Sequence, residues 1–141
     1  MRDLMALGAS YVSNALASPH LYRVMFDAEV DLEDPAAAAE TFHVLVSCAA
    51  RARQSGRFAV TCDPEAVATR FWAMGHGVTM LVLTAALPRA LDVHVPAMAT
   101  ALSVSAGDDP DDCRRSARSG WRTFDPPAPL WWAWPTPCSA R

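Results

Sequence analysis

Three dipeptides restrict most strongly what this chain can fold into, because each pairs a helix-capping residue with a proline. They are Ser18-Pro19, Asp34-Pro35 and Asp63-Pro64. A serine or aspartate side chain caps the free N–H groups of a first helical turn, and proline is well tolerated inside that turn. Apolar residues at helical spacing follow each dipeptide. The sequence therefore predicts a helix after each of the three.

Further helical patterns lie before and after these dipeptides. Asp3 is placed to cap a first helix, and Gly56 is placed to end the helix that begins at Pro35. The expected helices cover residues 3–17, 19–26, 35–55, 64–87 and 95–106. This pattern predicts an all-α fold, an antiparallel bundle of about five helices.

Composition limits the number of domains and the class of partner. The chain has 141 residues, of which 52% are hydrophobic, and this is enough for one domain with a core. The net charge is −3, so a basic footprint for nucleic acid is missing. The four cysteines form no Cys-x-x-Cys pair, and no signal segment opens the chain. We therefore expect a cytoplasmic protein with free thiols.

The composition changes after Ala106. Residues 107–141 hold six of the 11 prolines and four of the five tryptophans. The prolines between positions 126 and 137 exclude a regular helix there, and neither a helical nor a strand period fits this segment. We therefore expect a helical domain over residues 1–106 and an irregular or disordered tail over 107–141.

The expected helix at 64–87 is apolar on nearly all sides. Between Arg70 and Arg89 it carries no formal charge, which raises the question of a membrane span. His76, two glycines and two threonines in this stretch favour a core helix over a membrane helix, and no second hydrophobic stretch is present. Because few helices are available to cover it, a second copy of the chain is the expected partner.

The same helix contains the stretch "RFWAMGHGVTML". Trp72 and His76 are four residues apart and share a face, while Gly75 and Gly77 leave room for a neighbouring helix or a ligand. His76 has three readings: a hydrogen-bonded core histidine, a contact to a ligand, or a metal or catalytic residue. A zinc site from His43, Cys48, Cys62 and His76 lacks the usual ligand spacing. We predict no metal, no cofactor and no enzymatic activity.

Two separated motifs resemble a known family. "YVSNALASPHLYRVMF" is followed by "GRFAVTCDPEAVATRFWAMGHGVTML", and together they resemble the C-terminal domain of tetracycline-repressor-like (TetR family) transcription regulators with a Trp-x-x-x-His-Gly signature. In this sequence the signature is Trp72, His76 and Gly77. The resemblance covers residues 4–106. It implies an all-helical, homodimerising domain that binds a small, mostly apolar effector.

Regulators of this family are expected to carry a helix-turn-helix headpiece before this domain. The sequence starts inside the domain, so we expect a truncated regulator that does not bind DNA directly and acts only through a missing headpiece or an intact partner. The alternative is a helical interaction protein without a ligand, or the remnant of a disrupted regulator gene.

The inner faces of the predicted helices supply the expected site residues. The ligand-binding residues are expected to be Tyr11, Phe42, Phe71, Trp72, Met74 and His76. The dimer interface is expected to contain Val78, Val82, Met98 and Leu102.

Overall fold

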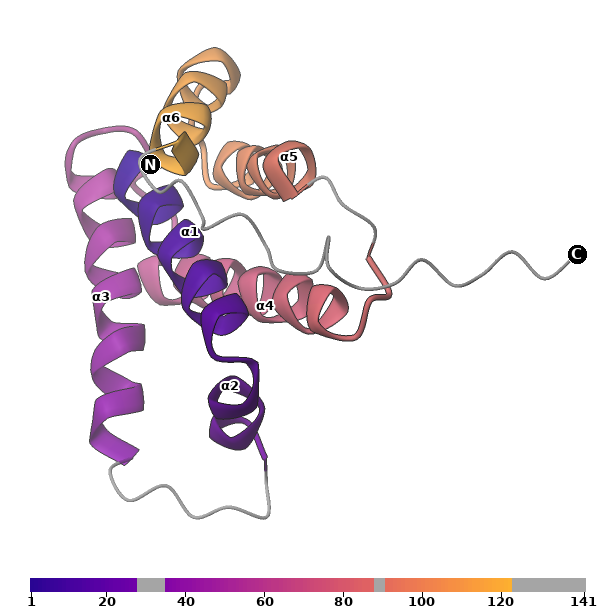
Figure 1. The fold of residues 1–141 in the computed structure, drawn as a ribbon. Coiled ribbons are helices and arrows are strands. Elements are labelled where there is room, and N and C mark those ends of the chain that lie inside the picture. The colour runs from indigo at the N-terminus through magenta and orange to yellow at the C-terminus, as the bar shows by residue number, and fades with distance from the viewer. Residues whose placement is uncertain (28–34, 88–90, 123–141) are drawn as a thin grey trace, which may run out of the picture.

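The computed structural model describes residues 1–27, 35–87 and 91–122. They form six α-helices and, within these ranges, no strand (Figure 1). The all-α fold is confirmed, with one helix more than expected. Asp34, the expected cap of the third helix, lies outside the described residues. The helices are α1 (Arg2–Ala17), α2 (Pro19–Met25), α3 (Pro35–Gln54), α4 (Pro64–Leu83), α5 (Leu91–Ser105) and α6 (Pro110–Arg122).

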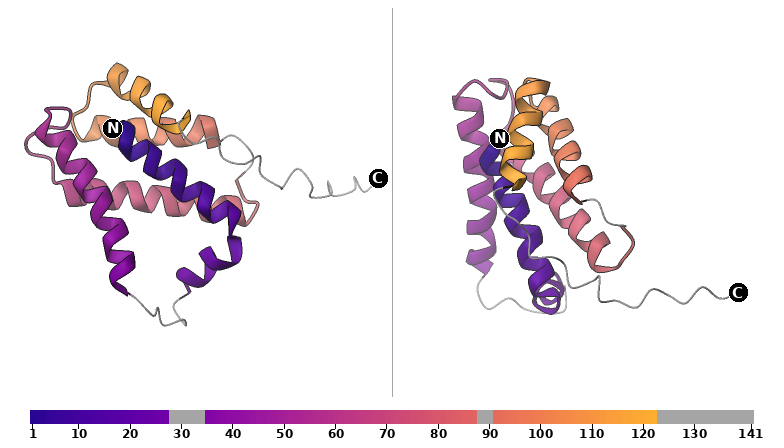
Figure 2. Two further views of the ribbon diagram at one scale, coloured as in Figure 1. Left: turned by 60° about the vertical axis from the view of Figure 1, so that its left-hand side comes forward. Right: turned by 45° about the horizontal axis from the view of Figure 1, so that its top comes forward.

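Helix α1 lies at the centre of the arrangement and packs against α3, α4 and α6 (Figures 1 and 2). In Figure 1, α3 runs beside α1 in the opposite direction, and α4 crosses behind both. The α5 and α6 helices pack together near the start of α1, whereas α2 follows its end. None of the described helices combines the length and the apolar character that a membrane span needs.

Some of the expected helix ends are confirmed and others are wrong. The Asp63 carboxylate caps α4 by accepting a hydrogen bond from the Glu65 N–H at 3.0 Å. Gly56 follows the end of α3 with φ at +75°, a conformation that glycine adopts without strain. Asp3 makes no cap hydrogen bond and instead pairs with Arg51 at 3.3 Å.

The core is built from a stripe of α1 and the helices around it. Small side chains are frequent in it, so the helix backbones approach closely; Ala49, Ala68 and Ala99 are completely buried. The larger side chains fill the remaining space, each contributing about 1.5–3 kcal/mol on burial. The main core residues are Leu4, Met5, Ala9 and Val12 of α1, Phe58, Val67, Phe71 and Val78 from the α3–α4 connection and α4, and Val95 and Ala99 of α5.

The last two expected helices differ in extent from the sequence prediction. The helix expected to reach residue 87 ends at Leu83, and the one expected to begin at residue 95 begins at Leu91. Pro96 therefore lies inside α5. Because proline has no N–H, one helical hydrogen bond is missing there.

The expectation of an irregular segment from residue 107 is wrong for residues 110–122, which form α6. Asp109 caps this helix by accepting hydrogen bonds from the N–H groups of Asp111 and Asp112, both at 2.9 Å. These bonds hold the pKa of the Asp109 carboxyl below its ordinary value. The buried face of α6 consists of Cys113, Ala117, Gly120 and Trp121. Residues 123–141, the rest of the expected tail, lie outside the described residues.

A buried ion pair joins the connection after α3 to the connection after α5. The Arg57 guanidinium donates to both carboxylate oxygens of Asp108, at 2.7 and 2.8 Å, and the Asp108 side chain is only 1% exposed. The Ala59 N–H also donates to the Ala106 carbonyl at 2.8 Å. No local sequence pattern indicates this pairing of Arg57 with Asp108.

We predict that Gly120→Ala destabilises the fold. A Cβ atom at this position would lie 2.4 Å from the Arg2 carbonyl oxygen and 2.6 Å from the Met5 Cβ, so α6 and α1 would have to separate. We expect a loss of about 1–3 kcal/mol in the free energy of unfolding, as in other overpacked cores. Urea denaturation followed by circular dichroism measures it.

The matched control is Gly8→Ala in α1, where a Cβ atom meets nothing within 4 Å. Alanine is the better helix former, so this change should stabilise the protein by about 0.5–1 kcal/mol. Equal effects of the two substitutions would contradict the close packing of α6 on α1.

Candidate functional site

Three polar side chains from three different helices meet: those of Tyr11, Tyr22 and His76. The Tyr22 hydroxyl lies 2.8 Å from His76 Nδ1, and the Tyr11 hydroxyl lies 3.4 Å from the same atom. The two hydroxyls are also 2.8 Å apart. Tyr11 is on α1, Tyr22 on α2 and His76 on α4. These contacts therefore hold the three helices together at one point.

Aromatic rings surround this hydrogen-bonded group. The Phe26 ring lies 4.3 Å from the His76 ring between centroids, and 6.4 Å from the Trp72 ring. Phe42 of α3 approaches Trp72 edge-on, with centroids 6.2 Å apart. Such tilted and edge-on contacts are favourable geometries for aromatic pairs. We call the whole group the aromatic cluster; it consists of Tyr11, Tyr22, Phe26, Phe42, Trp72 and His76.

The aromatic cluster has a buried base and an exposed rim. Tyr22, at the base, is 5% exposed. Phe26 and Trp72 form the rim and are 38% and 42% exposed. Burial raises the pKa of both the Tyr11 and the Tyr22 hydroxyl. Both hydroxyls therefore stay protonated at neutral pH and act as hydrogen-bond donors. The arrangement offers neutral polar groups beneath an apolar surface.

The structure brings four of the six predicted ligand-binding residues together in the aromatic cluster: Tyr11, Phe42, Trp72 and His76. The other two face the core. Phe71 is 6% exposed, and Met74 is partly buried against the core side chains.

Tyr22 and Phe26 of the aromatic cluster were missed as site residues, because the sequence predicted only a short helix over residues 19–26 at that place. One signal was present. A tyrosine on a buried face needs a hydrogen-bond partner for its hydroxyl.

The four residues predicted for a dimer interface lie in different environments. Val78 is 4% exposed and belongs to the protomer's own core, while Val82 and Leu102 are partly buried. Met98 is 43% exposed. Val78 is therefore already covered within one chain, and Met98 is available to a partner.

Further apolar residues of α4 and α5 are exposed, as Met98 is. Leu81 and Val104 are 45% and 38% exposed. Gly77 has free space where a Cβ atom would be, and Ala73 and Ala101 are exposed. We call the six residues Ala73, Gly77, Leu81, Met98, Ala101 and Val104 the α4–α5 face.

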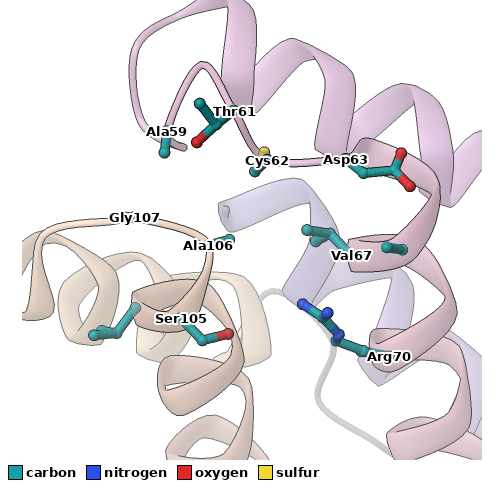
Figure 3. Close-up of a pocket in the computed structure, with 11 residues that line it drawn as sticks. Ala59, Thr61, Cys62, Asp63, Val67, Arg70, Ser105, Ala106 and Gly107 are labelled. Atoms are coloured by element: carbon teal, nitrogen blue, oxygen red, sulfur yellow. The ribbon is translucent and has the colours of Figure 1, made fainter.

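A separate recess of about 390 Å³ lies between the start of α4 and the end of α5 (Figure 3). Arg70 extends toward it, and Thr61, Cys62 and Ser105 contribute polar atoms to its walls. It shares no residue with the aromatic cluster. Within the described ranges, no three histidine, cysteine or acidic side chains lie close enough together to hold a metal ion.

A comparison with protein-family models identifies the chain. The model of the Tetracyclin repressor-like C-terminal domain matches residues 4–104, which include nearly all of α1 and α5, all of α2 to α4, and every member of the aromatic cluster. Helix α6 lies beyond the matched residues. No curated protein and no solved structure matches the chain. The chain therefore belongs to the tetracycline-repressor-like (TetR) family of transcription regulators, of which residues 4–104 form a C-terminal domain.

Proposed function

We propose that this domain regulates transcription by binding a small, mostly apolar effector at the aromatic cluster. The observation that carries the proposal is the exposed aromatic rim, in which Phe26, directly after α2, and Trp72 of α4 lie side by side next to the buried Tyr22. An apolar ligand placed on these rings would remove their exposed surface from water, which favours binding.

The position of the aromatic cluster supports a regulatory role. Its residues come from α1, α2, α3 and α4, so a ligand that contacts several of them binds one relative placement of these helices better than another. Such differential binding is what shifts a protein between conformations. In this family, the shift would reach DNA through a helix-turn-helix headpiece, carried by a longer form of the protein or by a partner.

We further propose that two copies pair through the α4–α5 face. Its exposed large side chains, Leu81, Met98 and Val104, are separated by Gly77 and alanines that allow two helices to approach closely. The residues of the α4–α5 face lie on two helices that pack against each other. An isologous contact of this kind would bury both copies of the face at once.

The effector proposal predicts that a panel of apolar aromatic compounds of drug-like size contains members that raise the melting temperature. At 100 times its dissociation constant, such a compound adds about 2.7 kcal/mol to the free energy of unfolding. Trp72→Ala should abolish the shift, because it removes the main exposed ring of the rim. Differential scanning fluorimetry measures the shift.

Leu21→Ala is the matched control, because Leu21 is 66% exposed and lies on α2 outside the aromatic cluster. It should leave the shift unchanged. The proposal fails if no compound produces a shift, or if Trp72→Ala keeps it.

The pairing proposal predicts that Leu81→Glu converts a dimer into a monomer. The new carboxylate would have to be buried without a partner in the interface, while in the monomer it stays in water. Leu21→Glu places the same charge on an exposed leucine of α2 and should leave the dimer intact. Multi-angle light scattering at micromolar concentration distinguishes the two species, and a monomeric unaltered chain would refute the proposal.

A further inference from the structure

Two hydroxyl groups converge on a single ring nitrogen of His76. Nδ1 lies 2.8 Å from the Tyr22 hydroxyl and 3.4 Å from the Tyr11 hydroxyl. The hydroxyls lie 2.8 Å from each other. The three groups thus form one chain of hydrogen bonds, and its direction determines which nitrogen of a neutral His76 carries the proton.

When these three contacts are counted, every proton is used only if Nδ1 is an acceptor. If Nδ1 is the acceptor, Tyr11 donates to the Tyr22 oxygen and Tyr22 donates to Nδ1. If Nδ1 carries the proton, it donates to Tyr22, and Tyr22 then donates to Tyr11. The Tyr11 proton is left in that case with no acceptor side chain in the part of the chain that the structure describes. A donor without a partner is unfavourable, so the first direction is preferred.

The proton of neutral His76 therefore lies on Nε2, the other ring nitrogen. Within the described ranges no protein group is hydrogen-bonded to Nε2, and no buried side-chain nitrogen or oxygen lacks a partner. A ligand therefore displaces no described protein group when it bonds to Nε2. The His76 ring lies beside Phe26 and Trp72, whose centroids are 4.3 and 6.3 Å away. A single N–H donor thus lies next to the exposed aromatic rim.

We propose that the effector is an aromatic or similarly apolar molecule that carries a carbonyl-type hydrogen-bond acceptor, and that this acceptor binds the Nε2–H group of His76. The inference rests on the proposed function, because it places the ligand at the same aromatic cluster. The apolar body covers Phe26 and Trp72, and the acceptor oxygen accepts the hydrogen bond from Nε2–H. Tyr11 and Tyr22 do not contact the acceptor; they are positioning residues that fix the proton on Nε2.

A pair of probes of equal size tests the acceptor. We would measure binding of 2-acetylnaphthalene and 2-ethylnaphthalene, which differ in one carbonyl oxygen, to the full chain by isothermal titration calorimetry. The ketone should bind about 5-fold tighter after correction for its more favourable hydration, which is the typical net effect of one neutral hydrogen bond. His76→Phe keeps a ring at this position but removes the donor. It should bring the ketone to the affinity of the hydrocarbon.

A second measurement does not depend on the folding of the His76→Phe variant. The ¹⁵N chemical shifts of the His76 ring report which nitrogen carries the proton. The unaltered chain should show the Nε2–H form, and Tyr22→Phe should increase the share of the Nδ1–H form. Phe26→Leu alters the rim but removes none of the three hydrogen-bonding groups. The ¹⁵N shifts of His76 in this variant should still be those of the Nε2–H form.

The outcomes separate the inference from the proposed function. Equal corrected affinities for the two probes, or an Nδ1–H form in the unaltered chain, would overturn the inference and leave effector binding at the aromatic cluster standing. Failure of both probes and of the wider compound panel to bind would overturn the proposed function, and the inference with it.

Discussion

Helix α1 packs against helices on several sides, and the burial of one stripe along it determines where those helices can lie. Leu4, Met5, Ala9, Val12 and Ala15 are all 4% exposed or less. The alanines allow close approach, and Leu4 and Met5 fill the space toward the start of the helix. The same helix places Met5 against α6 and Tyr11 against His76. Met5 and Tyr11 are about 9 Å apart along the axis of α1. The packing of α6 and the geometry of the aromatic cluster therefore share one support.

The fold could be predicted from the sequence wherever a helix has both a start signal and large apolar residues. Asp63 and Pro64 mark the start of α4 correctly, and apolar spacing follows them. Helix α6 has the same start signal, Asp109-Pro110, but the residues that it buries are mostly small. Cys113, Ala117 and Gly120 give little hydrophobic contrast, although they lie on one face. Helix α6 docks on α1 because Gly120 lets the two backbones come close together. A search for apolar periodicity does not detect such a close approach.

Four members of the aromatic cluster were predicted from the sequence, but only the pairing of Trp72 with His76 follows from spacing within one helix. The spacing of Trp72 and His76 places them on one face, and the structure joins their rings in one group. Phe71 and Met74 were grouped with them as residues of an inner helix face, yet α4 turns these two toward the core. Tyr22 reaches His76 across 54 positions of sequence, through the placement of α2. No local pattern specifies such a contact, since it follows from how α1 and α4 pack.

Pro96 has a consequence for the dynamics of α5. Pro96 is the sixth residue of α5 and has no N–H group, so the first turn is held to the rest of the helix by one hydrogen bond fewer than in an uninterrupted helix. Opening that turn therefore breaks fewer hydrogen bonds than opening a turn after Pro96. The segment after Pro96, which contains Met98, Ala101 and Val104, is hydrogen-bonded continuously to the end. Helix α5 therefore consists of two parts with unequal protection against amide hydrogen exchange, and the more protected part is the one that presents the apolar surface.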